Sequence, residues 1–540
     1  MSSIPPGFAA QHRYSITKIL NDRRMTARSR KLALWNYILN AEITMGSQFL
    51  VTKPDGSLYI TLGATNQTLS LPTGGRGGEK WFAYFNQMYG FTEREDQSKW
   101  LYDALRHYVL QQGARVELRR FSAYDLANKT VYLSAYNGQM YRLDGGDVQT
   151  VGAGEDGIFF ADDDGGQPCD VDVGPHGLLF DRLTNLNFAD SGLSGISPEQ
   201  QRKALIIWMF ALAFPDLMPT KPLVLLEGTQ GSGKSATCQL IQIALMGASS
   251  PMILSKNKED DFGVLLLRSP IAVFDNTDSY IEWVPDAICA YTTAGLWKKR
   301  KLYANDEEHI IRPHAFIAIA SKNPASFRRE DVADRCIILR LERRKIFVRF
   351  QKLQQEVLDQ RGQIFGEYLW YVNRIVEELR LYGDQEAEGE THRMADFAAL
   401  GRVVARVMDW PQSEIDGLML ALQGERDAFI NEEDPLVDLL HKWIAYRQKN
   451  GPSNIGRWIN PMQLLPELET LAQAYTVPFK HSARSLAQKL RSPHIEREFH
   501  VETTILAGHK TYRFYRHTDP RLEVVMGGDT SDDEELLEAP

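Results

Sequence analysis

Four runs of apolar residues recur between positions 223 and 341, and each is short, unbroken and rich in Val, Ile, Leu or Ala. Such runs are typical of parallel strands buried on both faces, and helical or irregular stretches separate them. The pattern therefore predicts an α/β core with a parallel sheet, preceded by an apolar helix from Ser197 to Phe214. The runs are Leu223–Leu226, Ile271–Phe274, Ala315–Ala320 and Cys336–Leu341.

Residues 1–185 mix helical and strand periodicity, which predicts an N-terminal α+β domain. Helices are expected at 31–39 and 99–112, and strands at 57–61 and 130–133, the second leading into the turn Tyr136-Asn137-Gly138. The domain ends in a glycine-rich acidic segment, in which no catalytic residue is assigned because acidic loops of this kind are far commoner than metal sites. Paired carboxylates like those of nucleotidyl transferases occur there at Asp162, Asp163, Asp164, Asp170 and Asp172.

Helical periodicity dominates after the last strand. Residues 350–430 are predicted to form a helical lid or linker. Three helices and a final hairpin are predicted in 431–520, an order that suggests a winged-helix-like domain, and residues 521–540 form an acidic tail expected to be disordered. The expected domains of this multidomain α/β protein are 1–185, 186–349, 350–430, 431–520 and 521–540. In the expected domain 431–520, the helices are 435–447, 460–475 and 482–490, and the strands are 496–505 and 510–515.

Charge and cysteine content limit the partners and the compartment. The chain carries 61 Lys and Arg against 70 Asp and Glu, a formal charge of −9 that alone argues against nucleic acid. Six of the carboxylates lie in the last twelve residues, however, so the rest of the chain is nearly neutral. The four cysteines have no metal-ligand spacing, and no apolar run is long enough to cross a bilayer. We expect a cytoplasmic protein with reduced thiols and no membrane partner.

A phosphate-binding motif follows the first predicted strand. Glycines let backbone N–H groups curl around phosphate oxygens at a helix N-terminus, Lys234 reaches the β- and γ-phosphates, and the Ser235 hydroxyl binds Mg²⁺. A strand before the motif and an amphipathic helix after it provide the required context. The motif predicts ATP and Mg²⁺ as cofactors, bound by Gly228, Thr229, Gln230, Gly231, Ser232, Gly233, Lys234 and Ser235.

A second magnesium ligand is expected at the end of another strand. The run Ile271–Phe274 leads into Asp275, which we predict to complete the metal site with Ser235. Asn276 follows, where ring ATPases usually carry a glutamate that polarises the attacking water. Asn276 is kept as a catalytic candidate, and the water-activating group is left open between Asp275 and Asp278.

Two further catalytic candidates lie between the third and the fourth apolar run. Asn323, just after the third apolar run, is placed to orient water between the γ-phosphate and Asp275. Arg335 directly precedes the last run, where an arginine would stabilise charge on the γ-phosphate of a neighbouring subunit. The alternatives are a surface salt bridge from Arg335 to Asp331 or Asp334, and a finger at Arg328 or Arg329.

In this order the motifs of residues 200–425 resemble an AAA+ module, with Asn323 at the position of sensor 1 and Arg335 at that of the arginine finger. Within that group they are most similar to the superfamily 3 and primase-helicase-type ATPases of phages and mobile elements. The closer similarity rests on Asn276 after Asp275 and on a charged segment, Trp297–Pro313, before the sensor 1 strand. The resemblance implies an AAA+ P-loop core, a helical lid and a homo-oligomer, with a hexamer expected.

The same resemblance implies contacts with DNA. In superfamily 3 helicases a hairpin at this place grips the DNA backbone, which assigns that role to Lys298, Lys299, Arg300 and Lys301; the alternative is a solvated strand edge. The third helix of the winged-helix-like domain adds Arg484 and Lys489 for phosphate contacts, although such domains also dock proteins. Another basic stretch is assigned to a subunit interface: Arg340, Arg343, Arg344, Lys345 and Arg349.

These inferences predict an oligomeric ATPase of a phage or mobile element that couples ATP hydrolysis to movement on single-stranded or forked DNA, as a helicase with a possible primase partner. One alternative is an ATP-switched initiator, loader or transposition regulator that binds DNA without unwinding it. The other is a protein remodeller or defence-system ATPase, for which an aromatic channel loop would be expected in place of the basic cluster.

Overall fold

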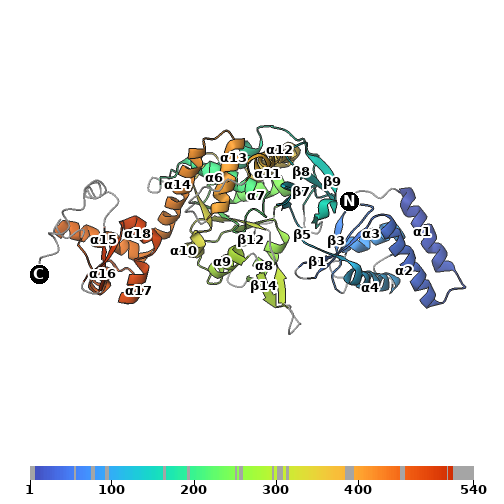
Figure 1. Ribbon diagram of the computed structural model, residues 1–540, viewed down its shortest axis with the longest axis horizontal. Helices are drawn as coiled ribbons and strands as arrows, with labels where there is room; N and C mark the ends of the chain where they lie inside the picture. Colours follow the sequence, from blue (N-terminus) through green and yellow to red (C-terminus); the bar gives the residue numbers. More distant parts are fainter. Residues whose placement is uncertain are drawn as a thin grey trace. The chain divides into compact units, whose positions relative to one another are not determined.

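The structure is a computed structural model that describes residues 6–53, 56–73, 79–91, 96–161, 166–190, 195–249, 252–253, 259–294, 297–300, 308–311, 315–383, 394–450, 457–506 and 509–514. The chain divides into two compact units (Figure 1). One comprises Met1–Ser191 and Ile196–Leu422, and the other comprises Gly192–Gly195 and Gln423–Pro540.

A five-stranded parallel sheet forms the centre of the first unit. All four predicted runs are confirmed as strands, and their side chains are buried almost throughout. Because the strands are parallel, the carboxyl ends of β11, β13 and β16 meet at one edge of the sheet, where ligands bind in open α/β folds. The order is β12 (Met252–Ile253), β13 (Ile271–Asp275), β16 (Phe316–Ser321), β11 (Leu223–Gly228) and β17 (Cys336–Leu341).

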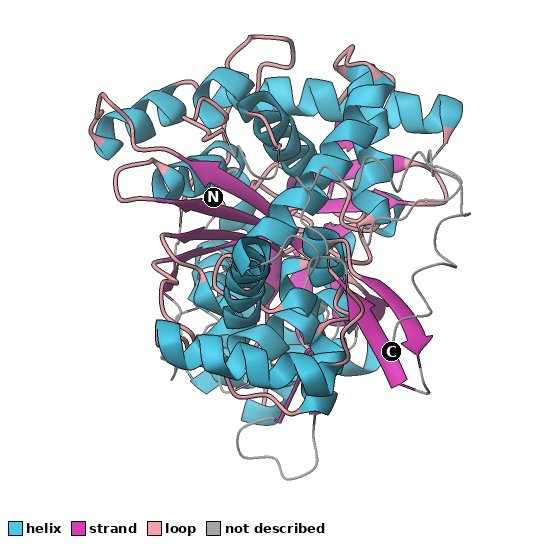
Figure 2. Cartoon of the chain, turned by 90° about the vertical axis from the view of Figure 1, so that its left-hand side faces the viewer, coloured by secondary structure: helices cyan, strands magenta, loops and turns pink. Residues whose placement is uncertain are grey.

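Helices cover both faces of this sheet (Figures 1 and 2). On one face, Trp208 of α6 (Pro198–Ala211) packs edge-on against Phe316, at 6.4 Å between ring centroids. On the other, Phe262 of α8 (Glu259–Arg268) stacks on Phe274 at 5.3 Å. The helix expected from Ser197 begins there with a capping box and ends at Ala211.

The predicted helices after β17 are present, and they share the core of the sheet. Tyr368 of α12 and Leu400 of α13 belong to the same hydrophobic cluster as Val224 of β11. This cluster fixes the position of the helices relative to the phosphate-binding strand. The helices are α11 (Phe350–Asp359), α12 (Arg361–Tyr382), α13 (Ala395–Val407) and α14 (Gln412–Asn431).

The N-terminal region contains the predicted mixture of helices and strands. A four-stranded meander, β6 to β9, contains the predicted strand at 130–133, and Tyr136 and Gly138 adopt the positive φ angles of the predicted turn. A second sheet, ordered β3-β2-β1-β4, packs with α1 to α4 around a separate core. The bounds are α1 (Pro6–Asn21), α2 (Ala27–Thr44), β1 (Gln48–Thr52), β2 (Leu58–Thr61), β3 (Thr68–Ser70), α3 (Glu79–Tyr89), α4 (Asp96–Gln112), β4 (Ala114–Val116), β5 (Leu118–Arg119), β6 (Ser122–Asp125), β7 (Thr130–Ser134), β8 (Gln139–Leu143), β9 (Gln149–Gly152), β10 (Phe159–Phe160) and α5 (Leu179–Leu183).

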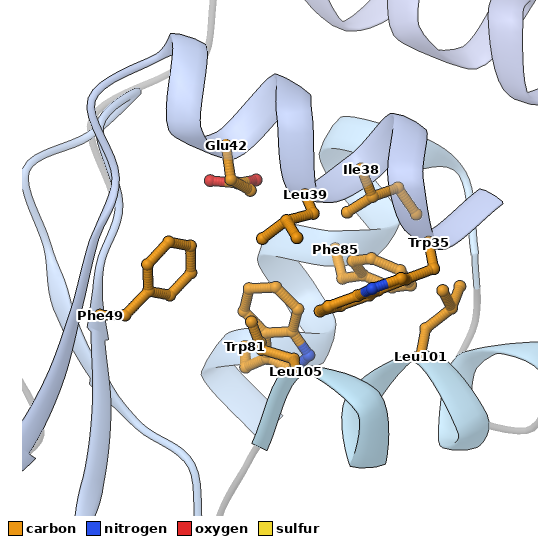
Figure 3. A pocket seen from close by; sticks show the side chains of 9 residues that line it. All are labelled: Trp35, Ile38, Leu39, Glu42, Phe49, Trp81, Phe85, Leu101 and Leu105. Atoms are coloured by element: carbon orange, nitrogen blue, oxygen red, sulfur yellow. The ribbon is translucent and has the colours of Figure 1, made fainter. Parts of the chain in front are cut away.

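A buried carboxylate, Glu42, borders a small cavity in this N-terminal core (Figure 3). The cavity has room for about one water molecule and is otherwise lined by aromatic and aliphatic side chains. Burial raises the pKa of Glu42, and hydrogen bonds from Ser47, Tyr89 and Tyr84 oppose that shift only in part. Because three hydroxyl groups donate hydrogen bonds to it, the Glu42 carboxylate is a structural part of this packed core.

Part of the acidic segment packs against α12. A Cβ atom on Gly362 would lie 2.0 Å from the Asp170 carbonyl oxygen, and one on Gly366 would lie 1.7 Å from that of Asp172. The two glycines therefore let the backbone of 170–172 lie directly on the helix. No group of three or more metal-ligating side chains occurs among the described residues, and Asp162–Asp164 lie outside them.

The second unit contains the three predicted helices and the hairpin, packed around one core. The expected strand 496–505 is wrong in its first half, because α18 continues to Phe499. Pro493 begins this helix, Ile495 and Phe499 bury one face of it, and His500 ends it with a φ of 45°. The elements are α15 (Pro435–Asn450), α16 (Pro461–Tyr475), α17 (Ala483–Lys489), α18 (Pro493–Phe499), β18 (Glu502–Leu506) and β19 (His509–Arg513).

Candidate nucleotide-binding site

The predicted phosphate-binding loop joins β11 to α7 (Lys234–Met246). Gly231 and Gly233 have φ angles of 84° and 95°, in the left-handed region that favours glycine. Gly233 is the N-cap of α7, and no side chain caps the helix there. The free N–H groups of the first turn therefore point toward the loop, as an anion site requires.

Two polar groups of the loop fit a phosphate ligand. The Lys234 Nζ is exposed and lies 3.3 Å from the Thr229 carbonyl oxygen, to which it donates. Ser232 is fully buried, and its Oγ has no hydrogen-bond partner within the described part of the chain. A buried hydroxyl without a partner is costly, so a bound oxyanion would stabilise this loop.

The two predicted magnesium ligands are in direct contact. Ser235 Oγ donates to Asp275 Oδ1 at 2.8 Å, and the Asn276 backbone N–H donates to the same oxygen at 2.9 Å. A hydroxyl beside a carboxylate supplies the hard oxygen atoms that Mg²⁺ prefers. Asn276 itself has a φ of 54°, and its backbone N–H also lies 3.1 Å from the Ala320 carbonyl oxygen.

Asp278 links the ends of β13 and β16. Its Oδ1 accepts hydrogen bonds from Ser321 Oγ at 2.7 Å, from the Lys322 N–H at 2.7 Å and from the Asn323 N–H at 3.3 Å. Burial tends to raise the pKa of Asp278, but these bonds and the charge of Lys234 outweigh it and lower the pKa below 3.8. Ser321 was not among the sequence candidates, because only the fold brings it to Asp278.

Asn323 lies in the loop after the third apolar run, and its backbone N–H donates to Asp278. Its Oδ1 is buried and has no hydrogen-bond partner in the described chain. Lys234, Ser235, Asp275, Asp278 and Asn323 thus gather at the carboxyl edge of β11, β13 and β16.

The three candidate finger arginines differ in exposure. Arg335 is only 5% exposed and donates a hydrogen bond to the Asp331 carbonyl oxygen of its own chain. The Arg328 side chain is 11% exposed and lies 3.3 Å from Glu227. The Arg329 side chain is 40% exposed, in ion pairs with Asp331 at 2.6 Å and Asp286 at 2.7 Å.

Glu227 precedes the first glycine of the loop and was not singled out from the sequence. It is 8% exposed, and its carboxylate lies 3.3 Å from both Arg328 and Arg340. The ion pairs join the ends of β11 and β17 to the segment that follows Asn323. The sequence shows the charges but not that these three segments meet.

The predicted basic hairpin is present between α9 (Val284–Ala294) and β16. Strands β14 (Trp297–Arg300) and β15 (Glu308–Ile311) pair antiparallel, with Trp297 opposite Ile311. Lys298, Lys299 and Arg300 belong to β14, whereas Lys301 lies outside the described residues.

Of the two predicted DNA-contacting residues in the second unit, Arg484 lies on the exposed side of α17. Lys489 forms an ion pair with Asp434 at 3.1 Å. The Asp434 side chain also accepts a hydrogen bond from the Leu436 N–H, at the start of α15. Lys489 therefore has a packing role in this unit in addition to any contact with phosphate.

Comparison with known proteins relates the region of the parallel sheet to a family of replication proteins. Residues 191–409, less than half of the chain, match the family model described as actinomycete integrative conjugative element replication protein. No curated protein matches the chain.

Among solved structures, the apo A form of the NrS-1 C-terminal region matches at 12% identity and a TM-score of 0.42, covering 88% of this chain and 98% of that one. A structure titled SCCmec type IV Cch, active helicase, matches at 11% identity and a TM-score of 0.43, covering 89% and 94%. No described helix is long and apolar enough to cross a membrane.

Proposed function

We propose that this chain is an ATP-hydrolysing replication protein of a mobile element, which works as an AAA+ homo-oligomer, with a hexamer expected, and couples hydrolysis to translocation on DNA and unwinding. The single observation that carries the ATPase assignment is the contact between Ser235 and Asp275 beside the phosphate-binding loop. The family match over residues 191–409 supports the replication role.

The residues present fit ATP and Mg²⁺. The uncapped start of α7 and Lys234 would hold the phosphates, and Ser235 and Asp275 would hold the metal ion, which supplies charge neutralisation when bound. We assign the orientation of water near Asp275 to Asn323, whose buried Oδ1 has no hydrogen-bond partner among the described residues.

The test is ATP turnover with and without forked DNA. Lys234→Ala should abolish hydrolysis, because the phosphates lose their loop cation while the fold is kept. Lys352→Ala is the matched control, since this lysine on α11 is 70% exposed and forms an ion pair with Glu356 at 3.9 Å. Turnover by Lys234→Ala at the wild-type rate, in a preparation free of contaminating ATPase, would refute the assignment.

A non-unwinding initiator or loader is the second candidate, and the residue that favours it is Asn276. An amide cannot take a proton from water as the usual glutamate does, which suits slow hydrolysis used as a switch. Strand displacement on forked DNA separates the candidates. ATP-dependent assembly on DNA with no displacement at any enzyme concentration would favour the switch.

Arg335 remains our proposal for a finger acting in trans, with Arg329 as the more exposed alternative. Replacing the true finger by Ala should keep nucleotide binding and lower hydrolysis by on the order of a thousandfold, whereas replacing the other arginine should not. Mixed with Lys234→Ala subunits, the true finger variant should regain activity, because some interfaces then pair an intact loop with an intact finger. Recovery with Arg329→Ala but not with Arg335→Ala would assign the finger to Arg329.

A further inference from the structure

The segment after β17, residues 342–349, lies on the phosphate-binding loop of its own chain. The Arg344 backbone N–H donates to the Gly231 carbonyl oxygen at 3.3 Å, and its guanidinium Nη2 donates to the Asn185 carbonyl oxygen at 2.7 Å. The sequence analysis assigns this basic stretch to a subunit interface. In the structure, Arg344 also contacts the phosphate-binding loop of its own chain.

Two side chains of this segment lie against the loop glycines. A Cβ atom on Gly231 would lie 2.8 Å from Cε1 of Phe347, and one on Gly233 would lie 3.2 Å from Nε of Arg344. The Arg343 guanidinium carbon lies 5.5 Å from the centroid of the Phe347 ring, within the range of a cation–π contact. Phe347 is nevertheless 58% exposed, so the loop and Arg343 leave much of its ring uncovered.

The strand order sets the direction of a bound nucleotide. Asp275 and Asn323 follow β13 and β16, on one side of β11, whereas β17 is the neighbour of β11 on the other side. A nucleotide whose terminal phosphate lies near Asp275 would direct its ribose and base away from β16, toward the β17 side, where residues 342–349 lie.

We propose that Arg344 and Phe347 bind the nucleotide in cis, Arg344 through the phosphate nearest the ribose and Phe347 by stacking on the base. The inference rests on the proposed function and identifies the base-side half of the same site. A guanidinium is suited to phosphate oxygens, and an exposed aromatic ring to the face of any base. Because the segment continues directly into α11, bound nucleotide also ties the lid helices to the loop.

Two competitors distinguish binding of the base from binding of the phosphates. They are ADP and inorganic tripolyphosphate, each of which displaces a fluorescent ADP analogue. Phe347→Ala should weaken ADP by about tenfold and leave tripolyphosphate unchanged, and Phe347→Trp should restore ADP binding. Arg344→Ala should weaken both competitors, with partial recovery in Arg344→Lys. Ile346→Ala is the matched control, because this neighbouring side chain is 81% exposed.

Other outcomes overturn the proposal in distinguishable ways. Unchanged ADP affinity in Phe347→Ala removes the stacking role. Unchanged affinity in both alanine variants, with loss of oligomer by light scattering, returns the segment to a subunit interface. Wild-type ADP affinity in Lys234→Ala would instead contradict the proposed function itself, which is why that variant is measured in parallel.

Discussion

The ion-pair group around Glu227 gives a quantitative prediction, because it lies at the base of the phosphate-binding loop. Glu227→Gln keeps the shape of the side chain but leaves Arg328 and Arg340 without the carboxylate 3.3 Å away. Breaking a buried pair costs about 3–5 kcal/mol. The Glu227 and Arg328 side chains are each 11% exposed, but Arg340 is 22% exposed, so we expect the low end, about 3 kcal/mol.

The assay is thermal unfolding of the full chain, with ATP turnover measured on the same preparations. A loss of this size should lower the Tm of the first unit by about 3 °C, because the entropy of unfolding grows with the size of the unit. The control is Glu342→Gln, an exposed residue whose carboxylate accepts only a 3.4 Å hydrogen bond from Asn187. If Glu227→Gln lowers the Tm no more than the control does, the pairs do not hold the strand ends together and the reasoning fails.

Three further outcomes follow from the same geometry. Asp275→Asn should retain ADP binding without metal but lose Mg²⁺-dependent turnover, as measured with and without EDTA, because Ser235 loses its charged partner. Replacing Lys298, Lys299, Arg300 and Lys301 together by Ala should leave basal hydrolysis near wild type but remove its stimulation by DNA. The slope of log affinity for single-stranded DNA against log salt should become shallower by roughly 0.7 per lost contact. An unchanged slope and unchanged stimulation would mean that the cluster is only a solvated strand edge. Burial lowers the pKa of Lys221 from 10.5 to about 8. Between these two pH values the unfolded chain holds a proton that the folded chain has lost, so the free energy of unfolding rises with pH. Lys221→Met should remove that rise, as measured by the Tm at about pH 7.5 and 9.5.

The strands and the loop could be predicted because their signals are local. A buried run such as Ile271–Phe274 needs no partner to be recognised, and the glycine spacing that ends in Lys234 fixes both a turn and a helix start. The same locality explains the error at 496–499. The sequence analysis predicts a strand there, but Pro493 at the start of a helix and the pair Ile495 and Phe499 four residues apart decide in favour of α18.

The contacts that complete the site could not be read from the chain, because they join distant segments. Ser321 reaches Asp278 across 43 positions, and Arg328 reaches Glu227 across 101. The exposure of a side chain cannot be read from the sequence either. Arg335 and Arg329 are both arginines beside α10 (Glu330–Ala333), but the first is buried and the side chain of the second is 40% exposed.

Because Asn276 stands where ring ATPases usually carry a glutamate, another group must activate the attacking water, and the site bears on whether Asp278 is that group. A general base works best with a pKa near the operating pH, whereas hydrogen bonds and Lys234 lower the pKa of Asp278 below 3.8 despite its partial burial. Asp278 is therefore a poor proton acceptor, and its three hydrogen bonds make it an anchor for the loop that carries Asn323. Asp278→Asn, which keeps an accepting oxygen, should retain a measurable part of basal turnover and the same pH dependence, whereas Asp278→Ala should lose more. Loss of all turnover in Asp278→Asn, in a protein with unchanged Tm and ADP affinity, would make Asp278 the base after all.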